Sequence, residues 1–234
     1  MKKNKIVMSV ISGLLVAAVA VGGTLAYLSD KSNVVTNTFN VGDGYVEEGE
    51  HQGLWLDETD ITDPDLMERT EKGNNYEDLQ PGSVMVKDPT FHMTAGSTDS
   101  YVFAKVEGVD AMIAAGYYFT VDEPQKLTDP TNSAFNTKWE KVADDGIAGN
   151  AGFDGVYIYR NGNDDIVSGG EELEPMFNWV KLGSDVDNTE FAAIEPSSVI
   201  IRGVAVQYAN LTDEEALVEA QGIFNNWDEE VAGE

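Results

Sequence analysis

Alternation of apolar and polar residues is the main signal along this chain, and it predicts short strands. Residues 198–209, SVIIRGVAVQYA, are apolar on both faces through their middle, which is typical of a strand at the centre of a sheet. In residues 101–109, Val102, Ala104 and Val106 share one face. Further strands, bounded by Gly, Pro, Asn and Asp, are predicted at residues 54–56, 84–87, 90–94, 116–121, 138–142, 155–160 and 176–182. This pattern predicts a mainly β fold, an antiparallel β-sandwich.

One segment has a clear helical period. In LTDEEALVEAQGIFNNW, residues 211–227, Thr212 and Glu215 have the spacing of a capping box. Four apolar side chains then fall on one face of the predicted helix: Leu217, Ala220, Phe224 and Trp227. Residues 43–78 are rich in acids and turn formers. They predict a long surface excursion with a helical turn near residues 63–69.

The first residues have the three-part pattern of a secretory signal. Three lysines precede the apolar stretch Ile6–Val21, and a glycine pair then leads to the small residues Thr24 and Ala26. We expect a signal helix that is cleaved between Ala26 and Tyr27. The alternative is an uncleaved membrane anchor, because the apolar stretch is nearly long enough to cross a bilayer.

A strand is predicted immediately behind this cleavage position. Residues 33–42, NVVTNTFNVG, place Val35, Phe39 and Val41 on one side of an extended chain. Residues 27–32 form a short polar linker in front of it, which we expect to be flexible. A strand on such an arm can pair within its own sandwich or add to the sheet of a neighbour. In the second case a fixed direction of addition produces an open filament.

Charge and composition exclude several classes of function. The chain has a formal net charge of −28, and loss of residues 1–26 removes three lysines and no acid, which leaves −31. Such a charge repels nucleic acid and anionic lipid, so we expect no nucleic-acid binding and no membrane contact beyond the uncleaved signal. The chain has no cysteine, which excludes disulfides, thiol catalysis and sulfur-ligated zinc.

Candidate chemistry is sparse. The two histidines, His51 and His92, occur without an HExxH motif, and His92 alternates with apolar neighbours as a half-exposed strand residue does. Acidic loops at residues 57–65, 161–165 and 185–188 supply the oxygen ligands that calcium prefers. Asp164 and Asp165 are the best calcium candidates, although NGNDD between two strands is first of all a turn.

Tryptophans offer a further alternative. Trp55, Trp139 and Trp179 could form a platform for sugars, but a sandwich without disulfides also needs an aromatic core. The core is the use that we expect.

Four segments resemble the TasA/camelysin family of secreted bacterial proteins. They are GGTLAYLSD at 22–30, NTFNVG at 37–42, LQPGSVMVKDPTFHMTAGSTDSYVFAKV at 79–106, and VAVQYANLTDEEALVEA at 204–220. The resemblance implies a jelly-roll sandwich, a signal processed by a SipW-type signal peptidase, and export into biofilm-matrix fibres. It also implies that Asn33–Val41 is a donor strand, with Val35, Phe39 and Val41 entering the next subunit.

These observations give one leading hypothesis and two rivals. The leading hypothesis is a non-enzymatic, secreted fibre subunit without a required cofactor, with a signal (1–26), an arm and donor strand (27–42) and a β-sandwich domain (43–234). Its partners would be copies of itself and, during export, the signal peptidase. The first rival is a monomeric cell-surface module that binds calcium or glycans. The second is a metallopeptidase, a class to which some relatives have been assigned, although no ligand motif supports it here.

Overall fold

The structure is a computed structural model. It describes residues 29–31, 47–49, 51–62, 68–122, 132–144, 152–162, 164–184 and 198–232. The elements in chain order are β1 (Ser29–Lys31), β2 (Glu47–Glu48), β3 (His51–Gln52), β4 (Leu54–Thr59), β5 (Arg69–Thr70), β6 (Val84–Val86), β7 (Thr90–Met93), β8 (Ser100–Glu107), α2 (Val109–Ala114), β9 (Tyr117–Thr120), β10 (Trp139–Asp144), β11 (Gly155–Tyr159), β12 (Trp179–Leu182), β13 (Ile200–Gln207) and α4 (Asp213–Ala232).

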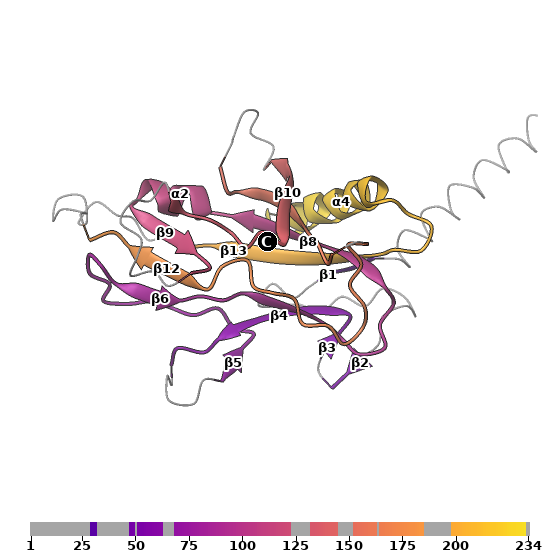
Figure 1. Cartoon of the computed structure of the whole chain (residues 1–234), viewed down its shortest axis with the longest axis horizontal. Helices are drawn as coiled ribbons and strands as arrows, with labels where there is room; N and C mark the ends of the chain where they lie inside the picture. Colours follow the sequence, from indigo (N-terminus) through magenta and orange to yellow (C-terminus); the bar gives the residue numbers. More distant parts are fainter. Residues whose placement is uncertain are drawn as a thin grey trace, which may run out of the picture.

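The strands form antiparallel sheets, as the alternation predicts. A five-stranded sheet has the order β1-β13-β8-β11-β10, and two three-stranded sheets have the orders β6-β12-β9 and β5-β4-β7. Strands β2 and β3 form a separate hairpin. Figure 1 shows the five-stranded sheet lying over the layer that contains β4 and β6. The prediction of a mainly β, antiparallel fold is confirmed.

Strand β13 has the central place that its apolar pattern predicts. It pairs with β8 along its whole length, from Ile200 opposite Glu107 to Gln207 opposite Ser100. On its other side it pairs with β1. Side chains on both faces of β13 are buried, because one face looks into the core and the other is covered by α4.

The main core lies between the sheets. Val102, Ala104 and Val106 of β8 point into it, which confirms the predicted face. The other sheets add buried side chains to the same cluster, among them Leu54, Phe91, Met93, Phe119, Val180 and Leu182. Because several strands are each only a few residues long, this shared core rather than strand length holds the sheets together.

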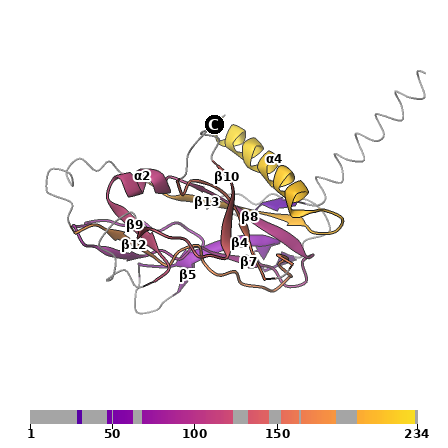
Figure 2. The ribbon, with the colours of Figure 1, turned by 45° about the horizontal axis from the view of Figure 1, so that its top comes forward.

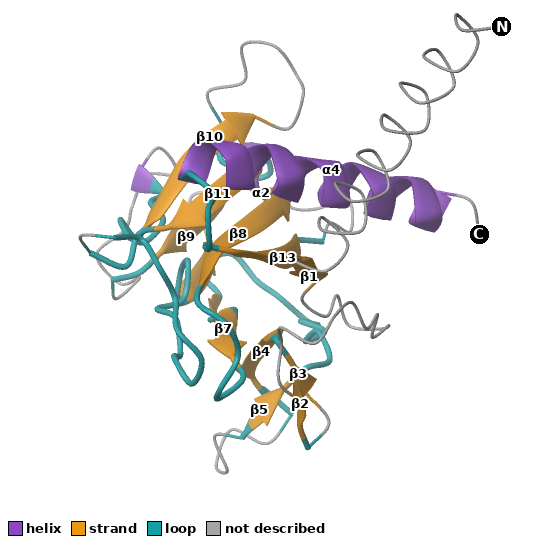
Figure 3. Ribbon diagram, turned by 90° about the vertical axis from the view of Figure 1, so that its right-hand side faces the viewer, coloured by secondary structure: helices purple, strands orange, loops and turns teal. Residues whose placement is uncertain are grey.

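Helix α4 covers the outer face of the five-stranded sheet. The capping box is present: the Glu215 N–H donates to Thr212 Oγ1 (3.3 Å) and the Thr212 N–H to Glu215 Oε2 (3.0 Å). The buried Ala216, Ala220 and Phe224 then pack on the sheet. Figures 2 and 3 show the helix lying across β8 and β13.

A second helix, α2, was not expected from the pattern. It has six residues and follows Gly108, whose φ of 88° lies in the left-handed region that suits glycine. The Asp154 carboxylate accepts hydrogen bonds from the N–H groups of Gly108 (3.0 Å) and Val109 (2.8 Å). Since this cap comes from a distant segment, local periodicity could not reveal the helix.

Two other local predictions are wrong. The helical turn does not extend to Arg69, because Arg69 and Thr70 form β5 and pair with Thr59 and Glu58; residues 63–67 lie outside the described residues. Within the linker 27–32 that was expected to be flexible, Ser29–Lys31 instead form β1. The pairing of β1 with the long edge of β13 accounts for this difference.

Candidate functional site

The edge of β13 beside β1 is the place where an N-terminal strand meets the body of the protein. Strand β1 runs antiparallel to β13, with Ser29 opposite Val206 and Lys31 opposite Val204. The described pairs on this side end at Val204, whereas β13 itself begins at Ile200. The edge therefore runs past β1 by several positions.

A groove lies where β13 begins. It has a volume of about 150 Å³ and is lined by Leu56, Asp57, Glu58, Thr70, Glu71, Lys72, Gly73, Lys87, Pro89, Val199, Ile200 and Ile201. Ile200 is 37% exposed, which is unusual for a large apolar residue in this protein. The groove thus joins an apolar strand edge to the polar flank formed by β4 and β5.

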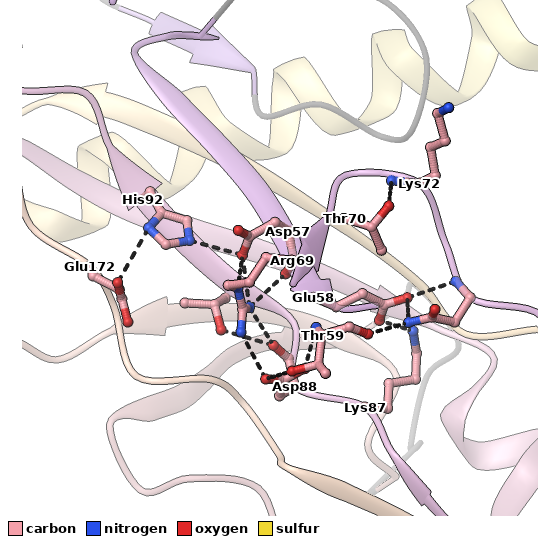
Figure 4. A network of polar contacts seen from close by, with 12 residues as sticks. Asp57, Glu58, Thr59, Arg69, Thr70, Lys72, Lys87, Asp88, His92 and Glu172 are labelled. Carbon is pink, nitrogen blue, oxygen red and sulfur yellow. Dashed lines mark hydrogen bonds and ion pairs between the residues drawn. The ribbon is translucent and has the colours of Figure 1, made fainter. Parts of the chain in front are cut away.

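Buried charges hold that flank in place, as Figure 4 shows. Asp57 is only 6% exposed, and its Oδ1 accepts hydrogen bonds from Arg69 Nε (2.8 Å) and His92 Nε2 (2.9 Å). Arg69 Nη1 also donates to Asp88 Oδ2 (2.9 Å). Burial alone would raise the pKa of Asp57, but the hydrogen bonds from His92 and Arg69 outweigh it and hold that pKa below its ordinary value.

A second carboxylate is held in the same way. Glu58 is 6% exposed, and its Oε2 lies 2.6 Å from Lys87 Nζ. Its Oε1 accepts hydrogen bonds from the Asn74 backbone N–H (2.8 Å) and side-chain amide (3.0 Å). The start of the acidic segment 57–65, which the sequence offers as an oxygen-rich loop, is therefore occupied by protein partners.

The two histidines come together around one tryptophan. His51 stacks on Trp55 with ring centroids 3.9 Å apart and an interplanar angle of 11°, and His92 stacks with a centroid distance of 4.1 Å and an angle of 14°. The pairing of β4 with β7 sets Trp55 opposite His92. His51 Nε2 donates to Glu71 Oε1 at 2.6 Å, and His92 Nδ1 lies 3.7 Å from Glu172 Oε2.

This arrangement bears on metal binding. Each histidine stacks on Trp55, and no group of three or more His, Cys, Asp or Glu side chains among the described residues is arranged to hold a metal ion. The prediction that His92 is a partly exposed strand residue is correct, since it lies in β7 with its side chain 13% exposed. The sequence analysis missed the stack. The signal was the spacing of 51 and 55, which puts both rings on one face if the chain is extended.

The calcium candidates lie in a turn at the protein surface. Asp164 is exposed, and Asp165 has a φ of 56°. Asp165 Oδ2 pairs with Arg160 Nη1 at 2.9 Å, and Arg160 also contacts Glu140 and Asp213. Asp165 therefore has a cation of the protein as its partner. Calcium binding at Asp164 and Asp165 stays a prediction.

The tryptophans do not share a surface use. Both faces of Trp55 are covered by imidazole rings. Trp139 is buried and donates its indole N–H to the Glu174 carbonyl oxygen (2.8 Å). Trp179 is half-buried in β12. Trp139 thus serves the core, as expected.

The remaining predicted site residues lie outside the described residues: Ala26 and Tyr27 at the cleavage position, and Val35, Phe39 and Val41 of the donor strand. Only Ser29–Lys31 of the segment 27–42 is described. Their predicted roles stay predictions.

Comparison with known proteins gives no family to which the chain can be assigned: no protein-family model, no curated protein and no solved structure matches it. Among the helices of the described residues, none is both long enough and apolar enough to span a membrane.

Proposed function

We propose that this protein is a secreted, non-enzymatic structural subunit of extracellular biofilm-matrix fibres, polymerising head to tail by donation of its N-terminal strand. The observation that carries the proposal is the antiparallel pairing of Ser29–Lys31 with β13 beside the groove at Val199–Ile201. It supports the idea that this edge accepts an extended N-terminal segment. In this proposal the sheets form a jelly-roll-like sandwich, and a signal peptide (1–26) directs export.

The β1 register indicates how a donated strand would lie. Continued along β13 toward its first residue, the same register sets Val35 opposite Ile200. Main-chain hydrogen bonds would then supply most of the affinity, and the apolar side chains Val35, Phe39 and Val41 would set the register. Because β13 already pairs with residues 29–31 of its own chain, donation exchanges this strand for the same segment of a neighbour. Such exchanges form new contacts at low cost.

The acidic surface sets a condition for assembly. A net charge of −31 on each cleaved subunit opposes association at low ionic strength. Salt shortens the range of this repulsion to about 8 Å at physiological ionic strength. We therefore expect cations to promote fibre growth.

Deletion of residues 27–42 tests the donor. The secreted protein without this segment is expected to stay monomeric under conditions in which the intact secreted protein forms fibres, as seen by electron microscopy. Fibres of unchanged form and number from the deleted protein would refute strand donation.

The absence of cysteine allows a sharper test of the acceptor. Protein carrying Val35→Cys, mixed under mild oxidation with protein carrying Ile200→Cys, is expected to give a disulfide-linked dimer when fibres form. The matched control is Val35→Cys with Val84→Cys, because Val84 is 41% exposed, close to the 37% of Ile200, but lies in a different sheet. Equal cross-linking of both pairs would contradict the proposed acceptor edge.

A further inference from the structure

The hairpin β2–β3 is held on the protein by very few contacts of its own. It has two pairs of residues, Glu47 opposite Gln52 and Glu48 opposite His51. An isolated hairpin of this length is not stable in water. The printed side-chain contacts that fasten it to the body are those of His51, which stacks on Trp55 of β4 and donates to Glu71.

We propose that the His51–Trp55–His92 stack is a proton-operated clamp, which holds the β2–β3 hairpin against β4 more tightly when the two imidazoles are protonated. Histidine is the side chain that changes charge between about pH 5 and 8. The chain has two histidines, and both lie on this one indole ring.

The groups around His51 favour its charged form. Its Nε2 lies 2.6 Å from Glu71 Oε1, so protonation turns a hydrogen bond into an ion pair. Its ring lies flat on Trp55, so the same proton adds a cation–π attraction. Both changes act directly on the contact between the hairpin and the body.

The groups around His92 act in the same direction. Its two ring nitrogens each face a carboxylate, Asp57 at 2.9 Å and Glu172 at 3.7 Å. Only the doubly protonated imidazolium can donate to both. Of the other charged groups near this ring, Arg69 is bound to Asp57 and Asp88, which partly offsets the carboxylates.

Glu171 also lines the cavity beside the stack, together with His51, Trp55, His92 and Glu172. Its carboxylate accepts hydrogen bonds from Asn161 and the Ser168 N–H, so it adds negative charge without a cationic partner among these contacts. Carboxylates therefore outnumber cations around the two rings. Repulsion between two protonated rings on opposite faces of Trp55 is weakened by these anions.

Amide hydrogen exchange in the full chain tests the clamp. After correction for the intrinsic pH dependence of exchange, the amides of His51 and Gln52 are expected to exchange roughly threefold to tenfold more slowly at pH 5.5 than at pH 7.5. The amides of β8 serve as the internal reference and are expected to show no such change. Hairpin exchange that is independent of pH would overturn the proposal.

Two variants separate the proton from the ring. His51→Phe keeps an aromatic ring on Trp55 but carries no proton, so the pH effect on the hairpin is expected to disappear. His51→Phe with the full pH effect would refute the clamp. In the unmutated chain, the two histidine ring signals in an NMR titration are expected to be coupled, and His92→Phe is expected to move the titration of His51. Independent titrations would count against a shared clamp. All readouts use the unassembled chain and do not depend on strand donation.

Discussion

Two regions of this protein are held together by different physics. Where α4 meets the five-stranded sheet, Ala216, Ala220 and Phe224 pack on apolar side chains of β8, β11 and β13. On the β4–β5 flank, the buried carboxylates of Asp57 and Glu58 are held by cations. The first contact is non-directional and scales with area, whereas the second needs every partner in place.

The difference has a consequence for robustness. An apolar contact loses stability in proportion to the atoms that are removed and is insensitive to pH. A buried ion network fails when a single partner is lost, because the remaining charge stays in a place that water does not reach. The α4 contact should therefore respond to volume, and the β4–β5 flank should respond to charge and pH.

The largest effect is expected from Phe224→Ala in the α4 contact. Phe224 is fully buried, so the variant loses about 3–5 kcal/mol of unfolding free energy through lost burial and the cavity that remains. Urea unfolding at pH 7 and at pH 4 measures this, and the loss is expected to be equal at both. Val218→Ala on the same helix is the control, since Val218 is 70% exposed and its loss should stay within about 0.5 kcal/mol.

A smaller and pH-dependent effect is expected from Arg69→Met on the flank. The variant leaves Asp57 and Asp88 without their shared cation and costs about 2 kcal/mol at pH 7, below the full value for a buried pair because Arg69 is partly exposed. The folded-state pKa of Asp57 is lowered, so its stabilisation is present above the ordinary aspartate pKa and is lost as pH falls through the folded value. The cost of the variant should therefore shrink in acid.

Urea unfolding of Arg69→Met between pH 7 and pH 3 follows this change. The double variant Asp57→Asn with Arg69→Met removes one of the stranded charges and is expected to lose less than the two single losses combined. If the loss in Arg69→Met were the same at pH 7 and pH 3, the flank would behave like the α4 contact, and the contrast between the regions would fail.

The same contrast explains what the sequence could predict. Alternation in residues 101–109 and 198–209 identified β8 and β13, and the period of residues 211–227 identified α4, because apolar burial leaves a local pattern in the chain. The partners on the flank are far apart, such as Asp57 with His92 and Glu58 with Lys87. No local period marks such pairs, so the acidic segment 57–65 could not be distinguished from an oxygen-rich metal loop.

The candidate site was predictable only in part. The sequence indicated an N-terminal strand able to add to a sheet edge, and the structure pairs Ser29–Lys31, slightly before the predicted strand, with β13. The histidine–tryptophan stack depends on the register of β4 against β7, which sets Trp55 opposite His92. Strand register follows from the assembled core, and a single sequence does not contain it in readable form.

The smallest effect is expected from Glu219→Gln, which tests whether the α4 contact is as free of charge effects as its apolar residues indicate. Both carboxylate oxygens of Glu219 are buried without a hydrogen-bond partner, and desolvation by burial raises its pKa. Stability linked to Glu219 is therefore fully present below the ordinary glutamate pKa and is lost as pH rises through the folded value.

Because glutamine stays neutral, Glu219→Gln is expected to be about 1 kcal/mol more stable than the unmutated chain at pH 7. The gain should vanish near pH 4, where the glutamate is itself protonated, and thermal unfolding at the two pH values measures it. Glu214→Gln is the matched control: Glu214 is exposed in the first turn of α4, where a negative charge favours the helix, so its loss should cost a few tenths of a kcal/mol. A stabilised Glu214→Gln, or a Glu219→Gln gain that persists in acid, would show that total negative charge rather than the buried position of Glu219 sets the response.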